Sequence, residues 1–226
     1  HPEVGITPGV ETTTGPLGAG FSNAVGMALA ERRLRALFGP EACDHFTYVL
    51  ASDGDLMEGV AHEAASIAGH QKLDHLVVFY DSNRISIEGS TDVTFTDDTA
   101  RRFEALGWAV AEIPGEDPDV IEEAARRMIA AGSQKPKLII CHTTIGRGAF
   151  EKEGTAGCHG SPLGRDIIER MRAAWNYGEP FCVADDVRAH VRTALDSRAR
   201  MYEEWCRRRD SLFAQNPEKA ALWNAL

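Results

Sequence analysis

Three acidic side chains follow a short apolar segment and are spaced by glycine and small residues. The apolar segment is Phe46 to Leu50, and the stretch after it, Ala51 to Gly59, has the sequence "ASDGDLMEG". A solvent-exposed turn would account for this composition. A site for a hard divalent cation, which prefers oxygen ligands, would account for it as well.

Asn83 follows Asp53 by thirty residues, and the sequence between them predicts one helix and one strand. Asp53 would therefore close one strand, and Asn83 would come just after the next. In a right-handed β-α-β unit both residues lie at the carboxyl edge of the sheet, where open α/β sheets bind ligands. A carboxylate, an amide oxygen and a nearby backbone carbonyl suit Mg²⁺, which takes its other ligands from phosphate and water. Gly54 would let a diphosphate approach the backbone closely.

The elements that must position these residues follow from the apolar pattern. The continuous run Leu76–Tyr80 is typical of a parallel strand covered on both faces. Strands that alternate with helices predict an α/β fold, with a parallel sheet flanked by helices and a C-terminal helical extension. We expect strands over 46–51, 76–80, 108–113 and 137–142, helices over 22–38, 57–71, 99–106, 118–131, 165–175 and 185–213, and an irregular glycine-rich stretch over 146–164.

Composition excludes several classes of protein. The 226 residues are 43% hydrophobic and 26% charged with a net charge of −10, which argues against a nucleic-acid surface. No run of 18 apolar residues exists, so we expect no membrane span. The chain opens at His1 without methionine, and we expect truncation at the N-terminus. Five scattered cysteines predict reduced thiols and a cytoplasmic protein: Cys43, Cys141, Cys158, Cys182 and Cys206.

Several separated motifs resemble one enzyme family. "SDGDLMEG", followed at thirty-residue spacing by "DSNRISIEG", resembles the thiamine diphosphate motif. Together with "HPEVGITPGVETTTGPLGAGFSNAVGMALAE", "DDTARRFEALGW" and "HGSPLG", it resembles the transketolases over residues 1 to about 164. The resemblance implies a thiamine diphosphate-binding domain over 1–182. It also implies a helical linker over 183–226, leading toward an absent pyrimidine-binding domain of the same longer chain or of a partner subunit.

The resemblance also assigns roles to single residues. Asp53, Asn83 and the main-chain carbonyl of Ile85 would ligate Mg²⁺, for which Ca²⁺ or Mn²⁺ can substitute. Ser52 stands where the family usually has glycine, and we expect slight crowding at most. His1, His159 and Glu58 would be catalytic. The cofactor would be contacted by Gly15, Leu17, Asp53, Gly54, Glu58, Asn83, Ile85, Ile145 and His159.

Each assignment has a plainer alternative. Glu58 can simply complement a helix dipole, His159 can be a surface histidine, and Ile145 can be ordinary core. The resemblance implies a homodimeric enzyme of the pentose phosphate pathway that transfers a two-carbon ketol unit between sugar phosphates. A dihydroxyacetone or deoxyxylulose phosphate synthase subunit, or a non-catalytic cofactor-binding protein, remains open. We expect the 226 residues alone to bind the cofactor weakly.

Overall fold

The computed structural model describes residues 2–226, which form two compact units. One unit joins the residues up to Leu29 with Phe46–Met171, and the other joins Ala30–His45 with Arg172–Leu226. The sequence did not predict that residues 30–45 would group with the C-terminal residues, and a domain boundary at 182 stays a prediction. None of the described helices combines the length and apolar character that crossing a bilayer requires.

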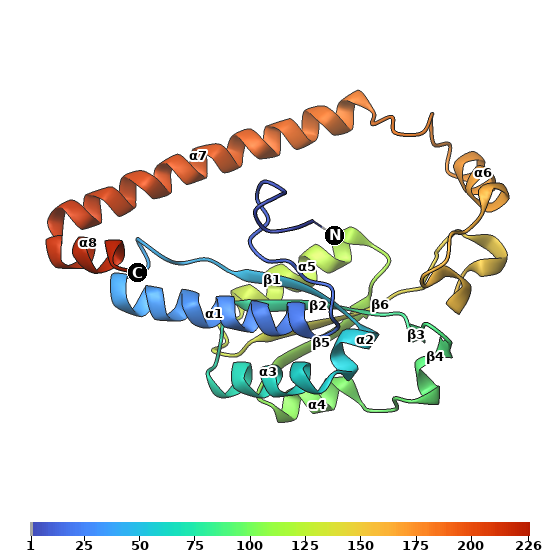
Figure 1. The fold of residues 1–226 in the computed structure, drawn as a ribbon, viewed down its shortest axis with the longest axis horizontal. Helices are drawn as coiled ribbons and strands as arrows, with labels where there is room; N and C mark the ends of the chain where they lie inside the picture. Colours follow the sequence, from blue (N-terminus) through green and yellow to red (C-terminus); the bar gives the residue numbers. More distant parts are fainter. Residues whose placement is uncertain (1) are drawn as a thin grey trace. The chain divides into compact units, whose positions relative to one another are not determined.

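The first unit is built on a four-stranded parallel sheet (Figure 1). Its strands are β1 (Thr47–Ser52), β2 (Leu76–Ser82), β5 (Ala109–Pro114) and β6 (Lys137–His142), in the order β1-β2-β6-β5. A small antiparallel hairpin, β3 (Ile85–Ser86) and β4 (Gly89–Ser90), follows β2. In the register Ser52 pairs with Asp81, and Ser82 pairs with His142. The carboxyl ends of β1, β2 and β6 are therefore level, as the parallel prediction requires.

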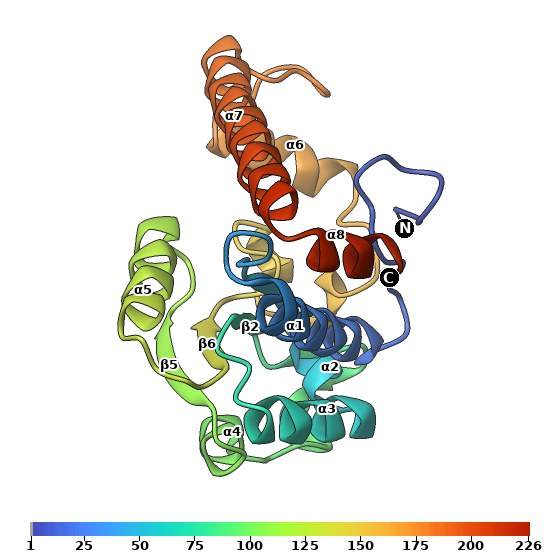
Figure 2. The same ribbon diagram turned by 90° about the vertical axis from the view of Figure 1, so that its left-hand side faces the viewer.

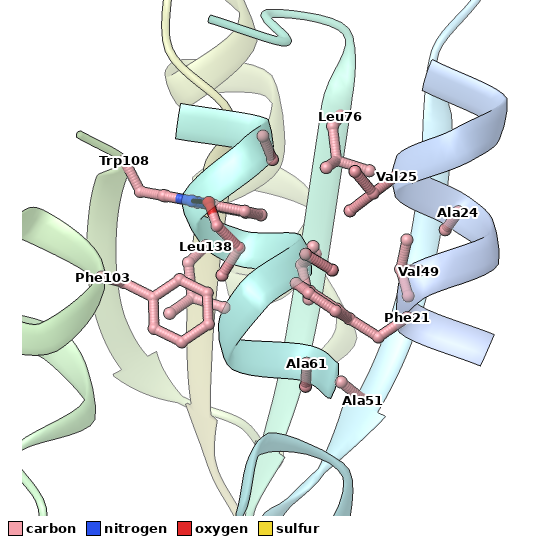
Figure 3. Close-up of a cluster of buried hydrophobic side chains, with 14 of the residues drawn as sticks. Phe21, Ala24, Val25, Val49, Ala51, Ala61, Leu76, Phe103, Trp108 and Leu138 are labelled. Carbon is pink, nitrogen blue, oxygen red and sulfur yellow. Dashed lines mark hydrogen bonds between the residues drawn. The ribbon is translucent and has the colours of Figure 1, made fainter. Parts of the chain in front are cut away.

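Three helices cover one face of the sheet and one covers the other (Figure 2). The first face carries the N-terminal part of α1 (Ala19–Phe38), α3 (Gly59–His70) and α4 (Thr99–Ala105). The buried positions of α3 are all alanine, which lets this helix pack closely. Trp108 Nε1 donates a hydrogen bond to the Ala65 carbonyl at 2.9 Å. Figure 3 shows the core beneath these helices, including Phe21, Val25, Val49, Leu76, Phe103, Trp108 and Leu138.

The opposite face is covered only in part. Helix α5 (Pro118–Ala130) packs over β5 and β6, where Ile113 and Ile139 are buried. Strand β1 has no such cover, and its Tyr48 and Leu50 side chains are 59% and 87% exposed. In the described part of the chain β1 also pairs on one side only, with β2.

The helix expected over 57–71 is confirmed as α3, which runs from Gly59 to His70, but a short helix that the sequence did not predict precedes it. Strand β1 ends at Ser52, and α2 (Asp53–Met57) begins at once, so Asp53 opens a helix and does not close a strand. The cause is local, because the backbone N–H and hydroxyl of Ser52 both donate to Asp55 Oδ2, at 2.9 and 2.8 Å. Helix α2 ends before Glu58, whose backbone is extended with a φ of −69° and a ψ of 139°, and α3 begins at the next residue.

The other predicted elements lie within a few residues of the observed ones. Strand β2 runs two residues further than expected, because its pairing with β6 continues to Ser82. The irregular stretch contains two short 3₁₀ turns, η2 (Phe150–Lys152) and η3 (Ala156–Cys158). A further 3₁₀ turn, η1 (Thr91–Val93), precedes α4, and α6 (Arg165–Ala174) follows the irregular stretch.

The second unit confirms the predicted C-terminal helices. It contains α7 (Asp185–Gln215) and α8 (Pro217–Asn224), of which α8 was not expected. Proline at its first position has the φ that a helix start needs. The Phe38 ring lies 6.1 Å from Phe213 and 5.0 Å from Trp223, measured between centroids. Trp205 Nε1 donates to the Ala42 carbonyl at 2.9 Å. These aromatic contacts form the core of the unit.

Candidate functional site

The Asp53 carboxylate joins the carboxyl ends of β1 and β2. Its Oδ1 accepts a hydrogen bond from the Tyr80 hydroxyl at 2.5 Å. Its Oδ2 accepts from the backbone N–H groups of Asn83 and Arg84, at 3.1 and 2.9 Å. The Asp53 carboxylate therefore lies against the backbone of Asn83, and the sharing of a cation by the two side chains stays a prediction. The contact arises because α2 begins directly at the end of β1 and turns Asp53 toward the neighbouring strand.

This carboxylate is buried among neutral donors. Asp53 is 5% exposed, and within residues 2–226 we find no ion pair to it. Burial, followed by the hydrogen bond to Asp53, raises the pKa of the Tyr80 hydroxyl, so this group stays protonated and donates. A buried anion without a cationic partner is costly. These three hydrogen bonds offset part of that cost, and the remaining acceptor capacity of the carboxylate fits a bound cation.

Asn83 and Ile85 bring further oxygen atoms to the same edge. Asn83 Oδ1 accepts a hydrogen bond from the Ile85 backbone N–H at 3.0 Å, which fixes the turn between β2 and β3. Both residues are half-buried. Carboxylate, amide and carbonyl oxygens are the ligand types that a hard cation takes.

The glycine-rich loop over residues 15–20 packs against α2. The Gly18 N–H donates to Asp55 Oδ1 at 3.1 Å. A Cβ atom at Gly18, whose φ is +75°, would lie 2.9 Å from both Glu58 Cβ and Val60 Cγ1. At Gly54 a Cβ would meet only Leu17, at an ordinary contact distance of 3.5 Å. Packing within the chain thus requires glycine at 18 and leaves space beside 54.

Asp55 was not among the predicted site residues, yet it links two of the predicted motifs. One of its oxygens holds the start of α2 through Ser52, and the other holds the glycine-rich loop. The Ser52 hydroxyl donates to this carboxylate, and the small effect of Ser52 on the site stays a prediction. The sequence signal was the spacing of Ser52 and Asp55, which is that of a helix-capping pair.

The segment after β6 carries the other predicted residues. Ile145 is half-buried and His159 is exposed at the end of η3. The loop around Ile145 is tied to residue 116, because Glu116 Oε1 accepts from the Thr144 N–H at 2.7 Å, and Oε2 pairs with Arg147 at 2.6 Å. Glu58 is exposed at the junction of α2 and α3, and Gly15 and Leu17 are exposed as well. His1 lies outside the described residues.

A polar cavity of about 390 Å³ opens beside Asp53. Tyr80, Arg84, Glu112 and His142 contribute to its lining. His142 Nε2 and Glu112 Oε2 are 2.9 Å apart at the ends of β6 and β5. Sequence reasoning missed this pair, although both residues were placed in or near the ends of expected strands.

Comparisons with known proteins agree with one another. A family model described as "Transketolase, thiamine diphosphate binding domain" matches residues 1–226. A transketolase of Geobacillus stearothermophilus is 46% identical over 98% of this chain and 34% of that protein. Transketolase 2 of Xanthobacter flavus is 48% identical over 98% of this chain and 33% of that protein. The solved transketolase from Leishmania mexicana superposes with a TM-score of 0.94 at 42% identity, over 100% of this chain and 34% of that chain. The chain thus spans about a third of the length of these relatives.

Proposed function

Because the chain belongs to the transketolase family, whose thiamine diphosphate-binding domain it matches, we propose that it forms the cofactor diphosphate-binding part of a transketolase. The reaction would move a two-carbon ketol unit from a ketose phosphate to an aldose phosphate. The observation that carries the proposal is the buried Asp53 carboxylate, which is surrounded by neutral donors at the carboxyl edge of the sheet.

Asp53, the Asn83 side chain and the Ile85 carbonyl would hold Mg²⁺, which would in turn hold the diphosphate. Packing within the chain does not require glycine at 54, since a Cβ would meet only Leu17 at an ordinary distance, and this supports a role of Gly54 in the close approach of the diphosphate to α2. Gly15 and Leu17 would contact the cofactor from the glycine-rich loop, and Ile145 would flank its rings. When bound, thiamine diphosphate supplies the electron sink that the breaking of a carbon–carbon bond beside a ketose carbonyl requires.

The exposed histidine and glutamate have roles that suit their positions. His159 would donate a proton or hydrogen bond to the diphosphate or to a reacting hydroxyl, because an imidazole titrates near neutral pH. His1 would contact the donor sugar. Glu58 would lie at a subunit interface and couple to the glutamate that activates the aminopyrimidine. Its exposure next to Val60, which is 45% exposed, supports such an interface and a homodimer.

The rest of the active site would come from outside residues 1–226. We propose that residues 1–182 form the diphosphate-binding domain and that 183–226 lead to a pyrimidine-binding domain, in the same longer chain or in a partner subunit. The relatives are about three times as long as this chain, which supports the first arrangement. The family match and the free cysteines agree with a cytoplasmic enzyme of the pentose phosphate pathway.

The test is removal of the Asp53 charge in the protein at its native length. Asp53→Asn keeps the shape of the side chain and should weaken Mg²⁺-dependent binding of thiamine diphosphate by about 100-fold or more. Loss of a residue that merely supports a metal ligand already costs about 10–100-fold. Binding is measured by calorimetric titration, and ketol transfer is assayed in parallel. Asp196→Asn, an exposed change in the middle of α7, is the control. Wild-type binding by Asp53→Asn would contradict the proposal.

A further inference from the structure

Tyr80 has no role in the function proposed above, yet it touches the central carboxylate. The residue is 5% exposed on β2, and its ring belongs to the core under α1, α3 and α4. Its hydroxyl donates to Asp53 Oδ1 at 2.5 Å, and its neighbours Ser82 and Thr99, the latter the first residue of α4, both act to lower the pKa of the hydroxyl. The Tyr80 hydroxyl therefore has neighbours on both β2 and α4 while it holds Asp53.

The hydrogen bonds of Asp53 leave little of its carboxylate free. An ionised carboxylate has about four lone-pair sites, two on each oxygen. The N–H groups of Asn83 and Arg84 use both sites of Oδ2, and the Tyr80 hydroxyl uses one of the two on Oδ1. One site remains, on Oδ1. Without the Tyr80 hydroxyl, both sites of Oδ1 would be open and the carboxylate would be held from one side only.

We propose that Tyr80 is a positioning residue that fixes the direction of the one open site on Asp53 Oδ1, and so favours Mg²⁺ over Ca²⁺. The inference rests on the proposed function, since it concerns the same cation site. Mg²⁺ demands near-ideal octahedral geometry, which a fixed carboxylate oxygen supports, whereas Ca²⁺ accepts carboxylates with one or two oxygens and in variable geometry. Hydrogen-bond partners of metal ligands orient those ligands in this way in other metal sites.

The test compares two cations in the Tyr80→Phe variant of the native-length protein. Calorimetric titrations of MgCl₂ and CaCl₂, each with thiamine diphosphate present, give the two dissociation constants. We expect the constant for Mg²⁺ to rise about 10-fold. The constant for Ca²⁺ should rise less, so that the Ca²⁺/Mg²⁺ affinity ratio increases at least about threefold. Tyr48→Phe, the same chemical change at an exposed tyrosine of β1, should leave both constants unchanged.

A merely structural role predicts something else. In that case Tyr80→Phe would lower the Tm of the cofactor-free protein and leave the cation ratio within about twofold of wild type, and the inference would be overturned. If Tyr80→Phe does not fold, Thr99→Val removes one neighbour of the hydroxyl and should shift the ratio in the same direction by a smaller factor. An unchanged ratio in that variant also overturns it.

Failure of the inference can be told apart from failure of the proposed function. If wild-type protein binds neither cation together with thiamine diphosphate, the proposed function fails and the inference fails with it. If wild type binds Mg²⁺, Asp53→Asn does not, and Tyr80→Phe equals wild type for both cations, only the role of Tyr80 is refuted.

Discussion

The two sides of the candidate site are held in different ways. At the ends of β1 and β2, Asp53 is buried and both of its oxygens are hydrogen-bonded to residues of the same unit. The segment after β6, which contains Ile145 and His159, is irregular and largely exposed. Glu116 accepts hydrogen bonds from Thr144 and Arg147 of this segment, and other hydrogen bonds lie within the turns of the segment itself. The domain core thus preforms the Asp53 side of the candidate site, whereas the His159 side depends on a few polar contacts.

The largest difference in stability between the two sides should come from a glycine-to-alanine substitution on each, at Gly18 on the Asp53 side and at Gly160 on the His159 side. Gly18→Ala places a Cβ 2.9 Å from Glu58 Cβ and Val60 Cγ1, at a φ of +75°. It should lower the free energy of unfolding by about 2 kcal/mol or more, since the left-handed conformation and the overpacking each cost energy. At Gly160, beside His159, an added Cβ would meet nothing within 4 Å. Gly160→Ala should therefore change the free energy of unfolding by less than about 0.5 kcal/mol. Urea denaturation of both variants measures this difference, and equal values would contradict the comparison.

A smaller effect is expected from releasing the loop after β6. Glu116→Ala removes the acceptor for the Thr144 N–H and the partner of Arg147. Because the ion pair is partly exposed, global stability should fall by no more than about 1 kcal/mol. Exchange of the Thr144 amide hydrogen should become faster, while that of Asn83 stays the same.

The control for this release is Glu122→Ala, which breaks a more exposed pair with Arg126 on α5. It should leave the Thr144 amide protected. If Glu116→Ala accelerated exchange at Asn83 as much as at Thr144, the two sides would not be independent.

Cysteine reactivity gives the mildest test of the comparison. Cys141 lies in β6, where burial, followed by Asp81, raises the pKa of its thiol, so it should have less thiolate than a free cysteine at pH 8. Cys158, next to His159, is only half-buried. Iodoacetamide should therefore modify Cys158 before Cys141, as read by mass spectrometry. Mg²⁺ with thiamine diphosphate should protect Cys158, and modification of Cys141 first would contradict the difference between the two sides.

The sequence predicted the sheet and the meeting of Asp53 with Asn83, because apolar runs and β-α-β geometry are local or topological signals. It placed the elements to within a few residues, apart from the helices α2 and α8 and the β3–β4 hairpin, which it did not predict. Helix α2 was missed because the acidic residues and glycines of "SDGDLMEG" are also typical of a turn. What separates α2 from α3 is the backbone of Glu58, which is extended where the glycine-rich loop packs.

The missed partners of the site are contacts between distant residues. Tyr80 belonged to an apolar run, and only its side-chain register reveals that its hydroxyl reaches Asp53. Asp55 and Gly18 are 37 residues apart, so no local pattern could connect them. The roles of His159, Glu58 and Ile145 rest on resemblance, because their positions alone fit a surface histidine, a helix-terminal carboxylate and a partly buried loop residue.

The uncovered face and free edge of β1 affect how this chain behaves in the test tube. Its unpaired backbone groups, beside the exposed side chains of Tyr48 and Leu50, can template pairing with another copy. Residues 1–226 produced in isolation should therefore be prone to aggregate. Tyr48 and Leu50 are not among the residues proposed to contact the cofactor. Charged substitutions at these two positions should therefore keep such a fragment in solution.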